Sequence, residues 1–254
     1  MIMRFLFKGV FMDEKTKAAL TEFTARLKEV FAGDLLAIVL YGSAAAGSYF
    51  DGVSDINVLV ILGKCSAAQL SLLGKTAGTL LRKYRISPFI MTHEEFNTAS
   101  DVFPLEYCDI LEANEIVYGN EEITKITVGK ENLRLQLEEK LRGAVSDIRG
   151  MLIKTGGNER PLEKFIFGLS SFGALIFRGL MRLREKSVTG LDAEATIALV
   201  EKEYGVSLEA FSVLNRLRQD KKIHPLKPTA FAETLLEALG VLVQKVDAME
   251  GKTK

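Results

Sequence analysis

Residues 37–62 read AIVLYGSAAAGSYFDGVSDINVLVIL, and this stretch decides the fold. It contains two runs of Val, Ile and Leu, which are separated by a segment rich in small and polar residues. Runs of this length and composition predict buried β-strands, which we place at Leu35–Leu40 and Asn57–Leu62. The pair Gly42-Ser43 follows the first strand, and Asp55 stands just before the second.

The pattern that these residues form resembles the signature of the DNA polymerase β-like nucleotidyltransferase superfamily, of the aminoglycoside and minimal type with a helical C-terminal domain. The resemblance implies a nucleoside triphosphate as substrate or ligand, and Mg²⁺ as cofactor. It also implies that Gly42 and Ser43 bind phosphate and that Asp55 is the catalytic residue and a metal ligand. Asn57 occupies the place at which the superfamily has its second metal carboxylate.

The metal site that the resemblance implies is therefore incomplete. Nucleotidyl transfer uses two divalent cations to hold the attacking and the leaving oxygen. Two acids at i and i+2 of a strand share one face and can hold both ions, whereas the amide of Asn57 carries no charge. We expect a degenerate site with weakened metal binding, in which Asp55 keeps its carboxylate.

The third acid of the superfamily's site comes from a neighbouring strand. Here residues 85–91 read RISPFIM, without an acid, and Ser87 stands at the corresponding place. The sequence offers Glu106 or Asp109 as a substitute metal ligand, from a further expected strand at Leu105–Leu111. Their spacing of three places them on opposite faces of a strand, so we expect at most one of them to contribute.

The order of elements predicts an α/β (α+β) nucleotidyltransferase-like domain with a mixed sheet at residues 1–125, followed by an all-α helical bundle at residues 126–254. Helical periodicity marks residues 13–31 and 66–84, and Thr92 with Glu95 is typical of a capping box. The remaining expected elements are strands at Ile86–Met91 and Glu115–Tyr118, and helices at Glu131–Leu152, Pro161–Leu183 and Phe231–Val246.

Composition limits the partners. The 33 basic and 33 acidic residues cancel, which argues against a nucleic-acid-binding surface. The apolar run 165–180 is short and contains Gly and Ser, which favours a buried core helix over a membrane span. Residues 1–11 lack a signal-peptide cleavage site and favour a short strand or a docking segment. Two cysteines, Cys65 and Cys108, make no disulfide framework, so we expect a cytoplasmic protein.

Three functions are compatible with these residues. The first is a nucleotidyltransferase-fold protein that binds a nucleotide or a partner with weak or no transfer activity. The second is an active Mg²⁺-dependent enzyme that moves a nucleoside monophosphate to a hydroxyl of a small molecule or a protein, with Asp55 assisted by Glu106 or Asp109. The third is an antitoxin-like or regulatory interaction protein that keeps the fold as a scaffold. Asn57 and the acid-free strand favour the first function.

Overall fold

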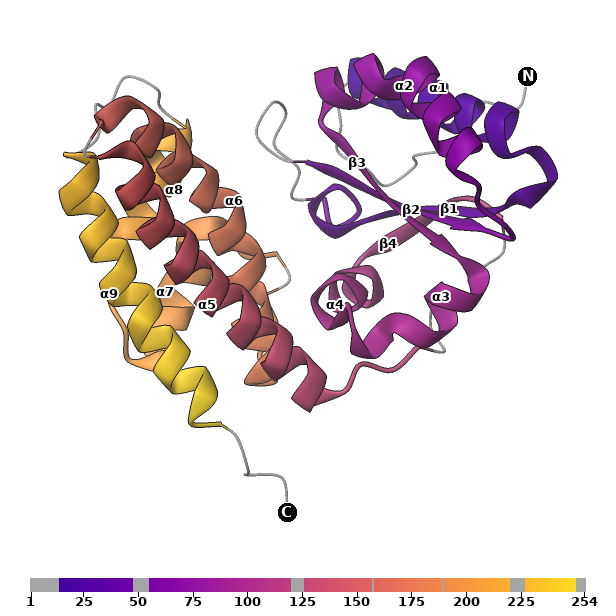
Figure 1. Ribbon diagram of the computed structural model, residues 1–254. Coiled ribbons are helices and arrows are strands. Elements are labelled where there is room, and N and C mark those ends of the chain that lie inside the picture. Colours follow the sequence, from indigo (N-terminus) through magenta and orange to yellow (C-terminus); the bar gives the residue numbers. More distant parts are fainter. Residues whose placement is uncertain are drawn as a thin grey trace. The chain divides into compact units, whose positions relative to one another are not determined.

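The computed structural model describes residues 14–47, 55–119, 126–156, 158–188, 190–219 and 227–249 (Figure 1). The chain divides into two units between Val128 and Gly129. The segment 1–11, for which we expect a strand or a docking role, lies outside the described residues.

A mixed β-sheet organises the first unit. Pro88 lies in an edge strand, where the missing backbone N–H is tolerated. Within the described residues the strands are β1 (Leu35–Tyr41), β2 (Ile56–Leu62), β3 (Ile86–Thr92) and β4 (Asn114–Tyr118). Their order is β3-β2-β1-β4, with β1 antiparallel to β2 and β4, and with β2 parallel to β3. This sheet confirms the predicted fold class of the first half.

Helices cover both faces of the sheet (Figure 1). Helices α1 (Glu14–Phe31) and α2 (Ala67–Tyr84) lie on one face, where Ile38 packs in the same cluster as Phe23. Helices α3 (His93–Thr98) and α4 (Pro104–Glu112) lie on the other, where Val39 shares a cluster with Tyr107. Because both faces are buried, β1 and β2 read as continuous apolar runs instead of alternating ones.

Local capping signals fix the ends of two of these helices. Ser66 accepts a hydrogen bond from the backbone N–H of Gln69 at the start of α2. The predicted capping box of α3 is confirmed, because the Thr92 hydroxyl accepts from the Glu95 N–H while the Glu95 carboxylate accepts from the Thr92 N–H at 2.7 Å. These bonds from Thr92 lower the pKa of the Glu95 carboxyl.

The prediction of a strand at Leu105–Leu111 is wrong, because this segment forms helix α4. Pro104 occupies the first helical turn, where a missing N–H costs nothing. Tyr107 and Ile110 lie one turn apart and are both buried. The Tyr107 hydroxyl donates to the carbonyl of Phe96 at 2.7 Å, which ties α4 to α3.

The second unit is helical. Its described helices are α5 (Lys130–Thr155), α6 (Glu159–Leu183), α7 (Ala193–Tyr204), α8 (Glu209–Gln219) and α9 (Pro228–Asp247). Helix α5 packs against α6 and α9, and α6 packs against α8 through the rings of Phe177 and Phe211, whose centroids are 5.0 Å apart. Gly156, with φ of +54°, ends α5 between the two helices predicted at Glu131–Leu152 and Pro161–Leu183. Helices α7 and α8 are not among the elements predicted from the sequence.

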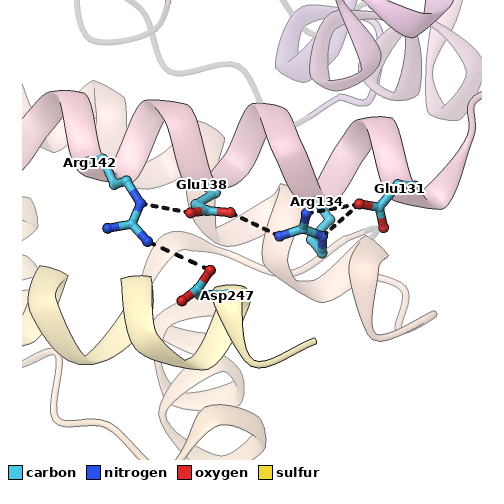
Figure 2. Close-up of polar contacts among 5 residues, drawn as sticks. All are labelled: Glu131, Arg134, Glu138, Arg142 and Asp247. Carbon is cyan, nitrogen blue, oxygen red and sulfur yellow. Dashed lines mark hydrogen bonds and ion pairs between the residues drawn. The ribbon is translucent and has the colours of Figure 1, made fainter. Parts of the chain in front are cut away.

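A chain of ion pairs runs along α5 and reaches α9 (Figure 2). Arg134 is only 3% exposed in its side chain and donates to Glu131 at 2.8 Å and to Glu138 at 2.9 Å. Arg142 donates to Glu138 at 2.7 Å and lies 3.7 Å from Asp247 of α9. The network therefore links two helices of the bundle.

Helix α6 has the length and apolar composition that a membrane span would need, and it is the one such helix within the described residues. Half of its most apolar window is buried inside the structure. The core helix of a bundle meets the same test, which agrees with the expectation from residues 165–180.

Candidate functional site

The residues of the predicted site lie at one end of the first unit's sheet. Tyr41, the last residue of β1, pairs with Asn57 of β2. Asn57 in turn pairs with Ser87 of β3. Leu59 lies two residues after Asn57 and packs among the residues under α3 and α4, so the Asn57 side chain belongs to that face of the sheet.

The Gly42 turn follows β1 directly and begins the short 3₁₀ helix η2 (Gly42–Ala44). Gly42 has φ of +73°, a backbone conformation that favours glycine. A Cβ atom at this position would come within 3.1 Å of the Asn57 Nδ2 atom. Both facts explain why a glycine stands here, because a larger residue would be strained and would also displace Asn57.

The two residues of the Gly-Ser pair differ in what they can still bind. The Gly42 N–H donates to the carbonyl of Ala113 at 3.2 Å, so it is used within the fold. Ser43 is half-buried, and its hydroxyl makes no hydrogen bond to any residue that the structure describes. Of the pair, Ser43 is therefore the residue with a side-chain donor available to a ligand.

Asp55 is bound by a neighbouring arginine. Both Nε and Nη2 of Arg85 donate to the Asp55 Oδ1 atom, each at 2.8 Å. The side chains of Arg85 and Asp55 are 42% and 44% exposed, so the pair lies at the surface of the site. The carboxylate that the sequence predicts as the principal metal ligand thus already has a cationic partner.

Arg85 is the site residue that the sequence analysis missed. It adopts a left-handed conformation (φ +52°) at the end of α2, and its carbonyl accepts from the Ile56 N–H at 2.9 Å. Because β2 and β3 run parallel with Ile56 opposite Ile86, the residues just before them, Asp55 and Arg85, lie side by side. The signal was a basic residue immediately before the strand that neighbours Asp55.

Glu106 and Asp109 lie on helix α4 and not on a strand, which overturns the argument that they cannot share a face. On a helix, residues three apart are neighbours on one face. Helix α4 packs against η2, the turn that follows Tyr41. Burial raises the pKa of the Tyr41 phenol, and the negative charges of Asp109 and Glu106 raise it further. Asp109 is 5% exposed, whereas Glu106 is half-buried.

The residues at the ends of β2 and β3 differ from the carboxylates that a two-metal centre uses. Asp55 is paired with Arg85, Asn57 carries an amide, and β3 contributes the hydroxyl of Ser87 in place of an acid. Over the described ranges of the chain, no group of three or more His, Cys, Asp and Glu side chains is placed to hold a metal ion. Mg²⁺ is usually bound through one or two carboxylates together with phosphate and water oxygens, and among Asp55, Asn57 and Ser87 only Asp55 has a carboxylate, which is paired with Arg85.

Comparison with solved structures supports the fold. The chain is similar to the crystal structure of spectinomycin adenyltransferase AAD(9) from Enterococcus faecialis with ATP and spectinomycin, with a TM-score of 0.59. The match covers 91% of this chain and 98% of that one at 11% sequence identity. No family model matches the sequence, and no curated protein matches it in a sequence search. The chain therefore has a nucleotidyltransferase-like domain followed by a helical domain, and the match at this identity establishes the fold alone.

Proposed function

We propose that this chain is a nucleotidyltransferase-fold protein that binds a nucleoside triphosphate at the Gly42–Asp55 end of the sheet, with weak or no nucleotidyl transfer. The observation that carries this proposal is the ion pair between Asp55 and Arg85, beside an amide at Asn57. The structural neighbour was solved with ATP and spectinomycin, so a nucleotide and a small molecule are the ligand classes to test first.

The chemistry of transfer explains why the activity is expected to be low. Two cations usually hold the attacking and the leaving oxygens and neutralise the charge that develops on the phosphate. Asp55 would have to give up Arg85 to bind a cation, and Asn57 would bring no negative charge to a second one. Phosphate binding needs less, because a hydroxyl such as that of Ser43 and a cationic side chain are sufficient donors.

The test has two parts that report separately on binding and on chemistry. Calorimetric titration with ATP is expected to give one binding site, weakened by Ser43→Ala and unchanged by the control Ser71→Ala on the exposed surface of α2. Pyrophosphate release in Mg²⁺, with and without an aminoglycoside acceptor, is expected to stay at background. Mg²⁺-dependent release that disappears in Asp55→Ala would refute the proposed loss of transfer activity.

An active Mg²⁺-dependent transferase is the second candidate, and one observation favours it. Helix α4, which packs against the turn η2 after Tyr41, carries Glu106 and Asp109 three residues apart, and on a helix this spacing allows both to face the same way, whereas on a strand only one could. In this case the two acids would replace the carboxylates missing from β2 and β3. Pyrophosphate release by the unmodified protein that falls in both Glu106→Gln and Asp109→Asn would support this candidate over the first.

We also infer a reducing, cytoplasmic location from the cysteines. Neither Cys65 nor Cys108 forms a disulfide in the structure, and Cys65 is exposed. Proteins that meet an oxidising compartment tend to pair such thiols. Fractionation of cells followed by thiol labelling tests this inference, and recovery of the protein with both cysteines oxidised would contradict it.

A further inference from the structure

Arg85 is held beside Asp55 by its backbone as well as by its side chain. Its N–H donates to the Leu81 carbonyl, and its carbonyl accepts from the Ile56 N–H at 2.9 Å. The backbone of Arg85 is therefore hydrogen-bonded both to α2 and to the first residue of β2. From this position the guanidinium reaches Oδ1 of Asp55 through two N–H groups.

The residues at the starts of β2 and β3 differ in charge from those of a metal site. The Asp55–Arg85 ion pair has no net charge. Asn57 and Ser87, which lie two residues further along β2 and β3 and pair with each other, are also uncharged. A divalent cation would have to displace a guanidinium that is already hydrogen-bonded at 2.8 Å. The guanidinium of Arg85 thus lies beside Asp55, at the place where the resemblance implies a metal ion.

The guanidinium retains donors for a ligand. Arginine has five N–H groups, and two of them are engaged by Asp55. No other acceptor for Arg85 occurs among the residues that the structure describes, and its side chain is 42% exposed. A planar guanidinium matches phosphate oxygens in bidentate geometry, and it does so without a metal.

We propose that Arg85 binds the phosphate groups of a nucleoside triphosphate in place of a divalent cation, so that nucleotide binding at this site is metal-independent. Asp55 then acts as a positioning residue that aims the guanidinium, and it is not a metal ligand. This inference rests on the proposed nucleotide-binding function and specifies the charge that neutralises the nucleotide.

The first experiment is calorimetric titration of ATP into the full-length protein, once with excess EDTA and once with excess Mg²⁺. We expect the two dissociation constants to agree within about threefold, and Arg85→Gln to raise the constant in EDTA by about tenfold or more. Arg82→Gln is the matched control, since Arg82 is exposed on the last turn of α2 and bonds only Thr79 among the described residues. It removes the same charge and is expected to leave binding unchanged.

Asp55→Asn is the second variant and separates the two roles of Asp55. A metal ligand would lose ATP binding only in Mg²⁺ on this change, whereas a residue that positions Arg85 changes ATP binding by the same factor in EDTA and in Mg²⁺. Circular dichroism and thermal melting check that each variant is folded. If Arg85→Gln does not fold, Asp55→Asn tests the role of the Asp55–Arg85 pair in its place.

The outcomes separate this inference from the proposed function. ATP binding that requires Mg²⁺, or metal-free binding that is unaffected by Arg85→Gln, overturns the role of Arg85 and leaves nucleotide binding in place. A loss of ATP binding in Asp55→Asn that occurs in Mg²⁺ and not in EDTA also overturns it. No ATP binding in either EDTA or Mg²⁺ overturns both the inference and the proposed function.

Discussion

The substitution Gly42→Ala tests how closely the turn after β1 and the Asn57 amide depend on each other. The φ of +73° at Gly42 is left-handed, and an alanine in that region costs about 1–2 kcal/mol. The new Cβ would also lie 3.1 Å from the Asn57 Nδ2 atom, so the amide must move by a few tenths of an ångström. Crowding of this kind adds roughly 1 kcal/mol, which gives an expected loss of about 2–3 kcal/mol in the free energy of unfolding.

Tyrosine fluorescence during urea unfolding is the suitable assay. The chain has no tryptophan, and all of its six tyrosines except Tyr204 lie in the first unit, so the signal reports mainly on that unit. In an Asn57→Ala background the cost of Gly42→Ala should fall toward the backbone cost alone, about 1–2 kcal/mol. Gly74→Ala, at an open position within α2, provides a reference of opposite sign with an expected gain of about 0.5–1 kcal/mol.

The reasoning would be refuted by either of two results. A cost for Gly42→Ala below about 0.5 kcal/mol would mean that the turn tolerates a side chain and that neither the backbone conformation nor the contact matters. An equal cost in the presence and absence of the Asn57 side chain would mean that the two residues are not in energetic contact.

Two further predictions concern other parts of the chain. Gly119→Ala should cost more than about 3 kcal/mol in the first unit, because its Cβ would collide with the Leu36 carbonyl oxygen on β1; a normal urea midpoint would contradict this. Arg134→Ala should lower the stability of the helical unit by roughly 2–4 kcal/mol, measured by circular dichroism in urea. Hydrogen bonds from Arg142 and Arg134 lower the pKa of Glu138. The contribution of Glu138 to the free energy of unfolding is therefore fully present above pH 4.5 and is lost as the pH falls through the lowered pKa. We expect the stability of the unmodified protein to fall more steeply over this range than that of Arg134→Ala.

The elements that were predicted from the sequence are those with a strong local signal. Val, Ile and Leu runs marked β1 and β2, and the spacing of Thr92 and Glu95 marked the start of α3, because a capping box is written in four consecutive residues. The seven residues Leu105–Leu111 predict a strand although they form helix α4, because so short a segment fits both periods. Pro104 at its first turn was the signal that favoured a helix.

The site could be predicted only where its contacts are local in sequence. The Gly-Ser pair and Asp55 stand within one stretch, but the partner of Asp55 comes from residue 85, thirty residues away. That contact depends on the parallel register of β2 and β3, which no single-strand pattern contains. The closeness of Gly42 and Asn57 likewise depends on the antiparallel pairing of β1 with β2.

A crystal structure of the protein with ATP and Mn²⁺, measured at the manganese absorption edge, tests the central claim most directly. The account predicts a phosphate group hydrogen-bonded to the Arg85 guanidinium, with Asp55 still paired to Arg85 and no anomalous peak at the Asp55 carboxylate. An anomalous peak that bridges Asp55 and the nucleotide, with Arg85 turned away, would contradict it.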